Sequence, residues 1–218
     1  KKQETETTTA VAEVPKSELA TTNASGLEIS STDIDVPRVN IVQKTSEIEA
    51  PLGAVVLDKQ HVLAEADEAI SVTVLSALKG WRENIDYDSD EIPQTAYTQE
   101  EADQIKATSE YDMLEFAEIT VLFKQPEGSD NDAAYPFPIG DDNYAIGRMN
   151  VSKDAYRQTF KRLATFAAFN PAASLQHRLW NFNSSLISRG KYSWFAPSLS
   201  VLQDEPTDAV KTFVGTFS

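Results

Sequence analysis

The chain contains no cysteine and only two histidines among its 218 residues. The lack of cysteine excludes disulfides, zinc ribbons, iron–sulfur clusters and thiol nucleophiles. The two histidines, His61 and His177, are 116 residues apart in the sequence, which argues against a histidine-rich metal site. We therefore expect no metal site and no cofactor.

Motifs of the common nucleotide-binding and hydrolytic enzymes are also missing. The eight glycines form neither a G-x-G pair nor a Walker-type phosphate loop, and there is no G-x-S-x-G nucleophile elbow. No Asp/Glu-x-Lys triplet of a carboxylate–lysine nuclease occurs. Carboxylates are abundant, but in a chain of net charge −15 we assign them mainly to the solvated surface. We predict that the protein is not an enzyme.

Long apolar runs are absent, and no stretch approaches the roughly 18 consecutive apolar residues that indicate a membrane span. The first six residues are polar and no apolar segment follows them, so we expect no secretory signal. The expected location is therefore cytoplasmic, in the host cytoplasm if the chain is viral, without membrane contact.

Aromatic residues are missing from the first third of the chain, because the first of the 20 is Trp81. Residues 1–33 are rich in Thr, Ser, Ala and Glu and show no apolar period. Such a segment buries too little apolar surface to offset the entropy lost on ordering. We predict a disordered polar leader over 1–33 and a single β-rich domain over 34–218.

Within that domain, short apolar runs bounded by turn residues predict strands, and one segment has clear helical periodicity. The helix is expected to begin after Ser152 and to end at Asn170-Pro171, with Tyr156, Phe160, Leu163 and Ala167 facing the core. A short exposed helix is expected at 98–106, within an acidic insertion around 83–110. Strands are expected at 37–43, 54–57, 69–75, 114–123, 143–149, 178–188 and 191–201. The predicted fold is mainly β with one clear helix, in the form of an OB-like β-barrel.

The charge is distributed very unevenly along the chain. Residues 82–143 carry 17 acidic and three basic residues, whereas residues 144–191 carry eight basic residues and one acidic residue, Asp154. The segment 148–195 also holds nine of the 20 aromatic residues. Basic groups neutralise phosphates and aromatic rings stack on unpaired bases, so this combination predicts a single-stranded nucleic-acid interface.

The candidate interface residues come from the predicted helix and from the two strands that follow it. The expected backbone contacts are Lys153, Arg157, Lys161, Arg178, Arg189 and Lys191, and the expected stacking residues are Trp180, Tyr192 and Trp194. Two alternatives stay open: the helical cations form an ordinary solvated face, and the strand aromatics pack into the barrel. The acidic stretch 82–143 is either a solvating insertion or a phosphate mimic that docks a basic partner.

Several short motifs resemble bacteriophage-type single-stranded-DNA-binding proteins over roughly residues 36–202. They are residues 36–46 (VPRVNIVQKTS), a strand led by Gly53, a strand ending near Gly80-Trp81, Trp180-Asn181-Phe182, and residues 190–197 (GKYSWFAP). The resemblance implies an OB-like barrel and a role in DNA replication or recombination. Such proteins dock replication enzymes through an acidic tail, whereas residues 210–218 here carry no acidic residue. The internal acidic segment is the candidate substitute.

The leading expectation is a non-catalytic, sequence-tolerant single-stranded-DNA-binding protein that acts in phage-type replication or recombination. Its expected partners are single-stranded DNA and, through acidic segments, replication or recombination proteins. A homo-oligomer is left open. The alternatives are a structural virion or assembly protein, and an acidic interaction or inhibitor protein.

Overall fold

The computed structural model describes residues 21–22, 28–29, 35–86 and 89–215. The chain divides into two units, Lys1–Asp35 and Val36–Ser218. In the first unit, β1 (Thr21–Thr22) pairs antiparallel with β2 (Glu28–Ile29). The rest of the predicted leader 1–33 lies outside the described residues, so its predicted disorder stays a prediction.

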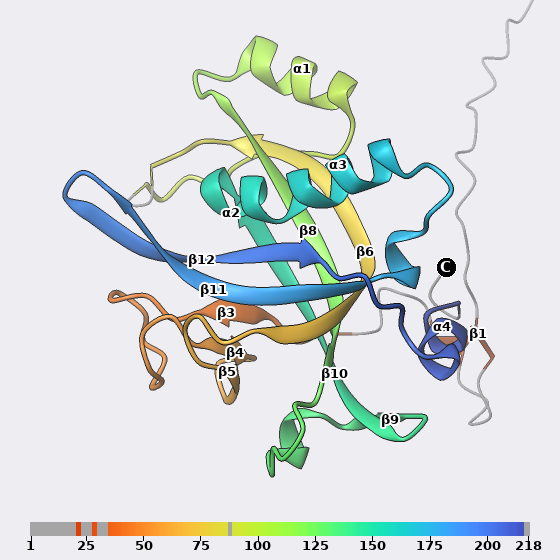
Figure 1. Ribbon diagram of the computed structural model, residues 1–218. Helices are drawn as coiled ribbons and strands as arrows, with labels where there is room; N and C mark the ends of the chain where they lie inside the picture. The colour runs from red at the N-terminus through yellow and green to blue at the C-terminus, as the bar shows by residue number, and fades with distance from the viewer. Residues whose placement is uncertain (1–20, 23–27, 30–34, 87–88, 216–218) are drawn as a thin grey trace, which may run out of the picture. The chain divides into compact units, whose positions relative to one another are not determined.

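The second unit is built on one antiparallel sheet with the strand order β12-β11-β6-β8-β10-β9, and β7 pairs with the end of β6. The sheet curls into a half-barrel (Figure 1). Its strands are β6 (Ile70–Glu83), β7 (Thr95–Ala96), β8 (Met113–Lys124), β9 (Phe137–Ile139), β10 (Asp142–Ser152), β11 (Leu179–Arg189) and β12 (Tyr192–Val201). The prediction of a mainly β fold is confirmed, while the OB-like form of the barrel stays a prediction.

A small second sheet connects the two sides of the half-barrel. It consists of β3 (Val39–Ile41), β4 (Val55–Leu57) and β5 (His61–Ala64). On one side, Arg38 forms a parallel bridge with Arg148 of β10. On the other side, the Gln43 carboxamide donates to the carbonyl oxygen of Phe195 in β12 at 2.8 Å and accepts from its N–H at 2.9 Å. The segment around β3 therefore contacts both β10 and β12.

The close approach of β3 to β10 depends on Gly147. A Cβ atom at this position would lie 2.5 Å from Cγ2 of Val39 and 2.8 Å from Cδ1 of Leu57. Only a residue without a side chain fits there. Gly147 therefore fixes the place where Arg148 meets Arg38.

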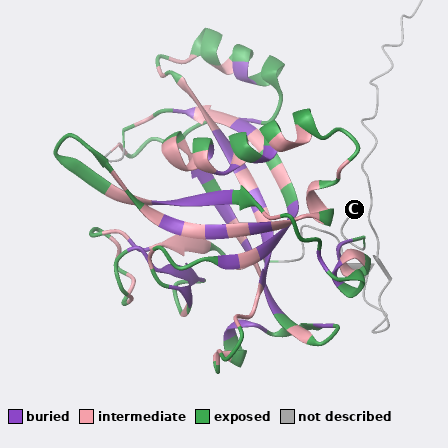
Figure 2. Cartoon of the chain, viewed as in Figure 1, coloured by how far each residue is buried: buried purple, intermediate pink, exposed green. Residues whose placement is uncertain are grey.

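The main core lies on the inner side of the sheet, where alternate residues of the long strands point inward (Figure 2). Val72, Phe123 and Phe182 are among its fully buried members, and the rings of Phe123 and Phe182 meet edge-to-face with centroids 5.4 Å apart. A bulge in β6 between Val74 and Ser76 shifts the alternation, so that Leu75 joins a second apolar cluster. The helix α4 (Asp208–Val214) supplies Val210 and Val214 to that cluster.

The segment predicted as one clear helix consists of two helices, α2 (Lys153–Gln158) and α3 (Phe160–Phe169). The break is at Thr159, whose backbone is non-helical (φ −118°, ψ −83°) and whose hydroxyl donates to the carbonyl oxygen of Ala155 at 2.6 Å. The same contact from the Thr165 hydroxyl to the carbonyl oxygen of Lys161 leaves α3 unbroken, so the hydroxyl contact accompanies the break at Thr159 and does not by itself cause it. Tyr156 and Leu163 are buried as expected, while Phe160 and Ala167 are partly buried.

Two further helices lie outside that segment. The short helix expected at 98–106 is α1 (Gln99–Thr108), and it begins with a capping box between Thr98 and Glu101. Its residues are exposed except for the buried Ala102 and the partly buried Ile105. The helix α4 was not expected from the sequence and adds to the clear helix and the short helix that were predicted. Single 3₁₀ turns occur at Asp132–Ala134 and Leu175–His177.

Candidate nucleic-acid interface

The β11–β12 hairpin extends beyond the sheet to which it belongs. The two strands pair with each other from Trp180–Val201 to Arg189–Tyr192, but β11 pairs with β6 only over its first four residues, up to Phe182. The outer part of the hairpin, residues 186–195, is called the hairpin arm below. It projects at the edge of the fold and is exposed at its tip (Figures 1 and 2).

The turn at the tip of the arm consists of Gly190 and Lys191. Gly190 has φ +59°, and a Cβ at this position would meet no atom within 4 Å. Backbone conformation, rather than lack of space, therefore favours glycine, as at the first central position of a type II′ hairpin turn. This turn places the Lys191 side chain at the end of the arm.

One face of the arm carries four of the side chains nearest the tip. Arg189 lies opposite Tyr192, and Ile187 lies opposite Trp194, so the period of two puts all four on the same face. The Tyr192 side chain is 64% exposed, and Nζ of Lys191 lies 5.2 Å from the centroid of its ring. Trp194 is partly buried. An exposed ring next to two cations can stack on a base while the cations contact phosphates.

Asp154 joins the arm to helix α2. Its Oδ1 accepts from Nη2 of Arg157 at 2.6 Å and from Nη2 of Arg189 at 2.7 Å. The carboxylate is only 12% exposed, whereas the two arginine side chains are 54% and 57% exposed. Lys153, the first residue of α2, is exposed and adopts a left-handed backbone conformation (φ +54°). The structure therefore brings Arg157 and Arg189 together on one carboxylate, and Lys153 precedes that residue in the sequence.

Lys161 lies on α3, beyond the break at Thr159. Its Nζ is 5.9 Å from the centroid of the Tyr156 ring, which stacks on Phe160 at 5.1 Å. The prediction of one cationic face relied on a spacing of four residues along an unbroken helix. Since the helix is broken, Lys161 does not continue the row of Lys153 and Arg157 in regular helical register.

Arg178 is at the opposite end of β11 from the arm. Its Nη1 donates to the carbonyl oxygen of Gln203 at 3.4 Å and lies 3.7 Å from Oε1 of Glu205. Eleven residues of extended strand separate Arg178 from Arg189, which corresponds to roughly 35 Å. The structure therefore does not bring Arg178 to the site formed by the other candidates.

The prediction that Trp180 stacks on a ligand base is wrong, because the side chain is buried in the core and is only 1% exposed. Its ring meets Phe166 of α3 edge-to-face at 5.3 Å, and its Nε1 donates to the carbonyl oxygen of Leu175 at 3.3 Å. The alternation of Trp180 and Phe182 with asparagines gave the correct period. It did not identify which side of the strand faces water.

The acidic insertion is anchored at its base by a buried carboxylate. Glu83 accepts from the N–H of Gln94 at 2.7 Å and from its side-chain amide at 3.2 Å. These hydrogen bonds, together with one to Ser109, lower the pKa of Glu83. Most of the other acidic residues in the insertion are exposed, which fits both the solvating and the docking interpretations.

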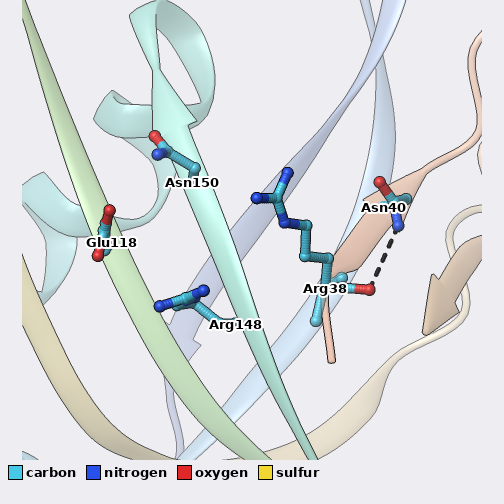
Figure 3. A pocket seen from close by; sticks show the side chains of 6 residues that line it. Arg38, Asn40, Glu118, Arg148 and Asn150 are labelled. Atoms are coloured by element: carbon cyan, nitrogen blue, oxygen red, sulfur yellow. Dashed lines mark hydrogen bonds between the residues drawn. The ribbon is translucent and has the colours of Figure 1, made fainter. Parts of the chain in front are cut away.

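Sequence reasoning missed one group of residues that the structure places together. A cleft of about 220 Å³ between β3, β8 and β10 is lined by Arg38, Val39, Asn40, Glu118, Arg148 and Asn150 (Figure 3). Arg148 was counted in the basic segment, and Arg38 belongs to the motif at 36–46. The two arginines are 110 positions apart in the sequence, so local patterns did not reveal their proximity.

Comparisons with protein-family models, curated proteins and solved structures found no match to this chain. Within the described part of the chain, no helix has both the length and the apolar character needed to cross a bilayer. The same residues contain no group of three or more acidic or histidine side chains placed to hold a metal ion.

Proposed function

We propose that the protein is a non-catalytic, sequence-tolerant single-stranded-DNA-binding protein that contacts DNA through its hairpin arm. The observation that carries this proposal is the exposed Tyr192 ring, flanked by Lys191 and Arg189 at the tip of a projecting hairpin. Stacking on any base and pairing with any phosphate require no particular sequence.

The charge around the arm supports this proposal. No acidic residue occurs between Asp154 and Asp204, a segment that includes all of α3, β11 and β12. A protein of net charge −15 thus presents an arm that carries only basic charges. Single-stranded DNA would approach this surface in preference to the acidic remainder.

The roles of the residues follow from their positions. Tyr192 and the partly buried Trp194 would stack on bases, while Lys191 and Arg189 contact the phosphates on either side. Lys153 and Arg157 extend the cationic surface along α2, and Lys161 on α3 is the outermost candidate. Trp180 has no part in the interface, and Arg178 lies outside it.

The wider role belongs to the same proposal. We place the activity in phage-type DNA replication or recombination, in the cytoplasm, with the acidic segment as the candidate docking surface for replication proteins. A second candidate function is assembly of a virion or of a homo-oligomer through the arm. On the face of the arm opposite Tyr192, the exposed Leu186 lies next to the partly buried Phe195, and this apolar pair favours the second function.

Fluorescence anisotropy of a labelled oligo-dT, measured at two salt concentrations with a duplex as control, tests the proposal. We expect tight binding to the single strand, weaker binding at the higher salt concentration, and little binding to the duplex. Tyr192→Ala and Trp194→Ala should each weaken binding by about 1–3 kcal/mol, or roughly 5- to 150-fold.

The matched control is Phe169→Ala, which removes an 82% exposed ring from the end of α3 in the same acid-free segment. It should leave the affinity unchanged. If wild-type protein binds no oligonucleotide at low salt but forms ordered multimers that Leu186→Ala disperses, the assembly function replaces DNA binding.

A further inference from the structure

Arg38 and Arg148 are held side by side by the backbone. The N–H of Arg148 donates to the carbonyl oxygen of Pro37 at 2.8 Å, and this bond forms the parallel bridge between Arg38 and Arg148. Bridged residues on neighbouring strands lie about 5 Å apart and point to the same face of a sheet. From this shared position the side chains diverge: the Arg148 guanidinium is turned toward Glu118 and the Arg38 guanidinium toward β10 (Figure 3).

Their guanidinium groups differ from those of the other arginines. Arg157, Arg162, Arg178 and Arg189 each donate to a carboxylate or a carbonyl oxygen, and Arg82 lies over the Phe116 ring. Within the described part of the chain, the guanidinium groups of Arg38 and Arg148 have no hydrogen-bond, ion-pair or ring partner. Both of these arginines line the same cleft (Figure 3).

The remaining polar groups of the cleft leave it with a net positive charge. Glu118 is its one carboxylate, and Oε1 of Glu118 already accepts from the Tyr97 hydroxyl at 3.2 Å. Asn40 and Asn150 add amide groups that can donate hydrogen bonds. Figure 3 shows Arg38 reaching from β3 toward β10, and Arg148 reaching from β10 toward Glu118.

We propose that this cleft binds a phosphate group, held between the guanidinium groups of Arg38 and Arg148 with Asn40 and Asn150 as additional donors. Planar guanidinium groups donate two parallel hydrogen bonds to phosphate oxygens, and such charge-assisted bonds are the stronger kind.

This phosphate can be a phosphodiester group of the single-stranded DNA that is proposed to bind at the hairpin arm. A second cavity of about 260 Å³ shares Val39, Asn40 and Asn150 with the cleft and is also lined by Phe195, which belongs to the arm. The two cavities together lead from the arginines to the Leu186–Phe195 face of the arm, which is opposite the face that carries Tyr192, so a DNA strand that reaches both would pass around the edge of the arm. This source rests on the proposed DNA-binding function, whereas a free phosphate or mononucleotide would bind the cleft without it.

The experiment uses the full chain with two probes, inorganic phosphate and a labelled oligo-dT. Titration with inorganic phosphate should shift the arginine Nε–Hε NMR signals of Arg38 and Arg148, whereas chloride at equal ionic strength should not. Arg148→Gln should abolish the shift at Arg38, and Arg38→Gln should abolish that at Arg148. The control, Lys106→Gln, removes one exposed charge from α1 and should leave both shifts intact.

The measurements with the oligonucleotide identify where the bound phosphate comes from. If the phosphate is a phosphodiester, each arginine variant should lower the slope of log affinity against log salt by about one. If these slopes stay unchanged while the phosphate shifts persist, a free phosphate group is the ligand. Phosphate shifts without any oligonucleotide binding by wild-type protein would refute the DNA-binding function and support the cleft. Absence of specific phosphate shifts would overturn the cleft proposal.

Discussion

Arg157 of α2 and Arg189 of β11 donate to the same carboxylate oxygen of Asp154, at 2.6 and 2.7 Å. The two arginines are 32 residues apart in the sequence, and α3 lies between them. Because Asp154 is the only acidic residue between 144 and 191, it both holds the arm against α2 and neutralises part of the basic surface. The same residue therefore affects stability and, under the proposed function, DNA affinity in opposite directions.

Asp154→Asn tests these opposing effects. The free energy of unfolding should fall by about 1 kcal/mol, because two charge-assisted hydrogen bonds with half-exposed arginines are weakened. Oligo-dT affinity should rise, because Arg157 and Arg189 are released to contact phosphates. The slope of log affinity against log salt concentration should become steeper by about one, which corresponds to one additional phosphate contact. Chemical denaturation and anisotropy measure the two quantities. If the variant is less stable but binds oligo-dT with unchanged affinity, these two arginines do not contact DNA.

Trp180→Phe separates a core role from a binding role. The buried indole packs on Phe166 and donates to the carbonyl oxygen of Leu175, so the smaller ring should lower the free energy of unfolding by about 1–3 kcal/mol. Oligonucleotide affinity of the folded variant should stay at the wild-type level. Tyr192→Ala should behave in the opposite way, since its ring is exposed. Loss of affinity without loss of stability at Trp180 would contradict its burial.

Local patterns predicted most of the secondary structure because alternation and helical periodicity record which side of an element is buried. The strand expected at 114–123 is β8, and the hairpin expected at 178–201 is β11 with β12. The strand expected at 69–75 is only the first half of β6, which continues to Glu83. The bulge at Leu75 reverses the alternation of apolar residues, so the alternation did not predict the second half. The break lies in the non-helical backbone of the single residue Thr159, which apolar periodicity does not report.

The candidate site was predicted in part, because composition identifies a segment and not a surface. The two-residue turn fixes the register of the hairpin, and this register places four of the predicted site residues on the arm: Arg189, Lys191, Tyr192 and Trp194. Trp180 lies in β11 and Arg178 directly precedes this strand, yet one is buried and the other is roughly 35 Å from the tip. Only tertiary contacts bring Arg38 to Arg148. Their pairing depends on the glycine at 147, whose role no local pattern reveals.

Gln43→Ala should weaken the connection between the β3 segment and β12. The carboxamide forms the two hydrogen bonds to the Phe195 backbone that a neighbouring strand would otherwise supply. Removing them should lower the free energy of unfolding by about 1–3 kcal/mol and speed amide hydrogen exchange at Phe195. The matched control is Gln60→Ala, in the exposed turn between β4 and β5, which should change neither quantity. Equal effects of the two substitutions would show that the Phe195 contact adds no stability.

Two buried tyrosines predict a loss of stability at alkaline pH. Burial, with smaller contributions from Glu68 and Asp142 respectively, raises the pKa values of Tyr135 and Tyr144 to about 12. The unfolded chain releases these protons near pH 10, whereas the folded chain keeps them until about pH 12. Their contribution to stability is therefore complete below pH 10. It falls between pH 10 and pH 12 by about 1.4 kcal/mol per pH unit for each ring.

Tyr135→Phe isolates one of the two groups. Its hydroxyl donates to the carbonyl oxygen of Leu63 at 3.4 Å, so the substitution removes a long hydrogen bond together with the titrating proton. The slope of unfolding free energy against pH, measured by urea denaturation between pH 10 and 12, should become shallower by about one proton. Phe169→Ala, which removes an exposed ring that carries no titrating proton, should leave the slope unchanged. An unchanged slope in Tyr135→Phe would mean that its phenol ionises at the same pH in the folded and unfolded chains, so that burial does not hold its proton.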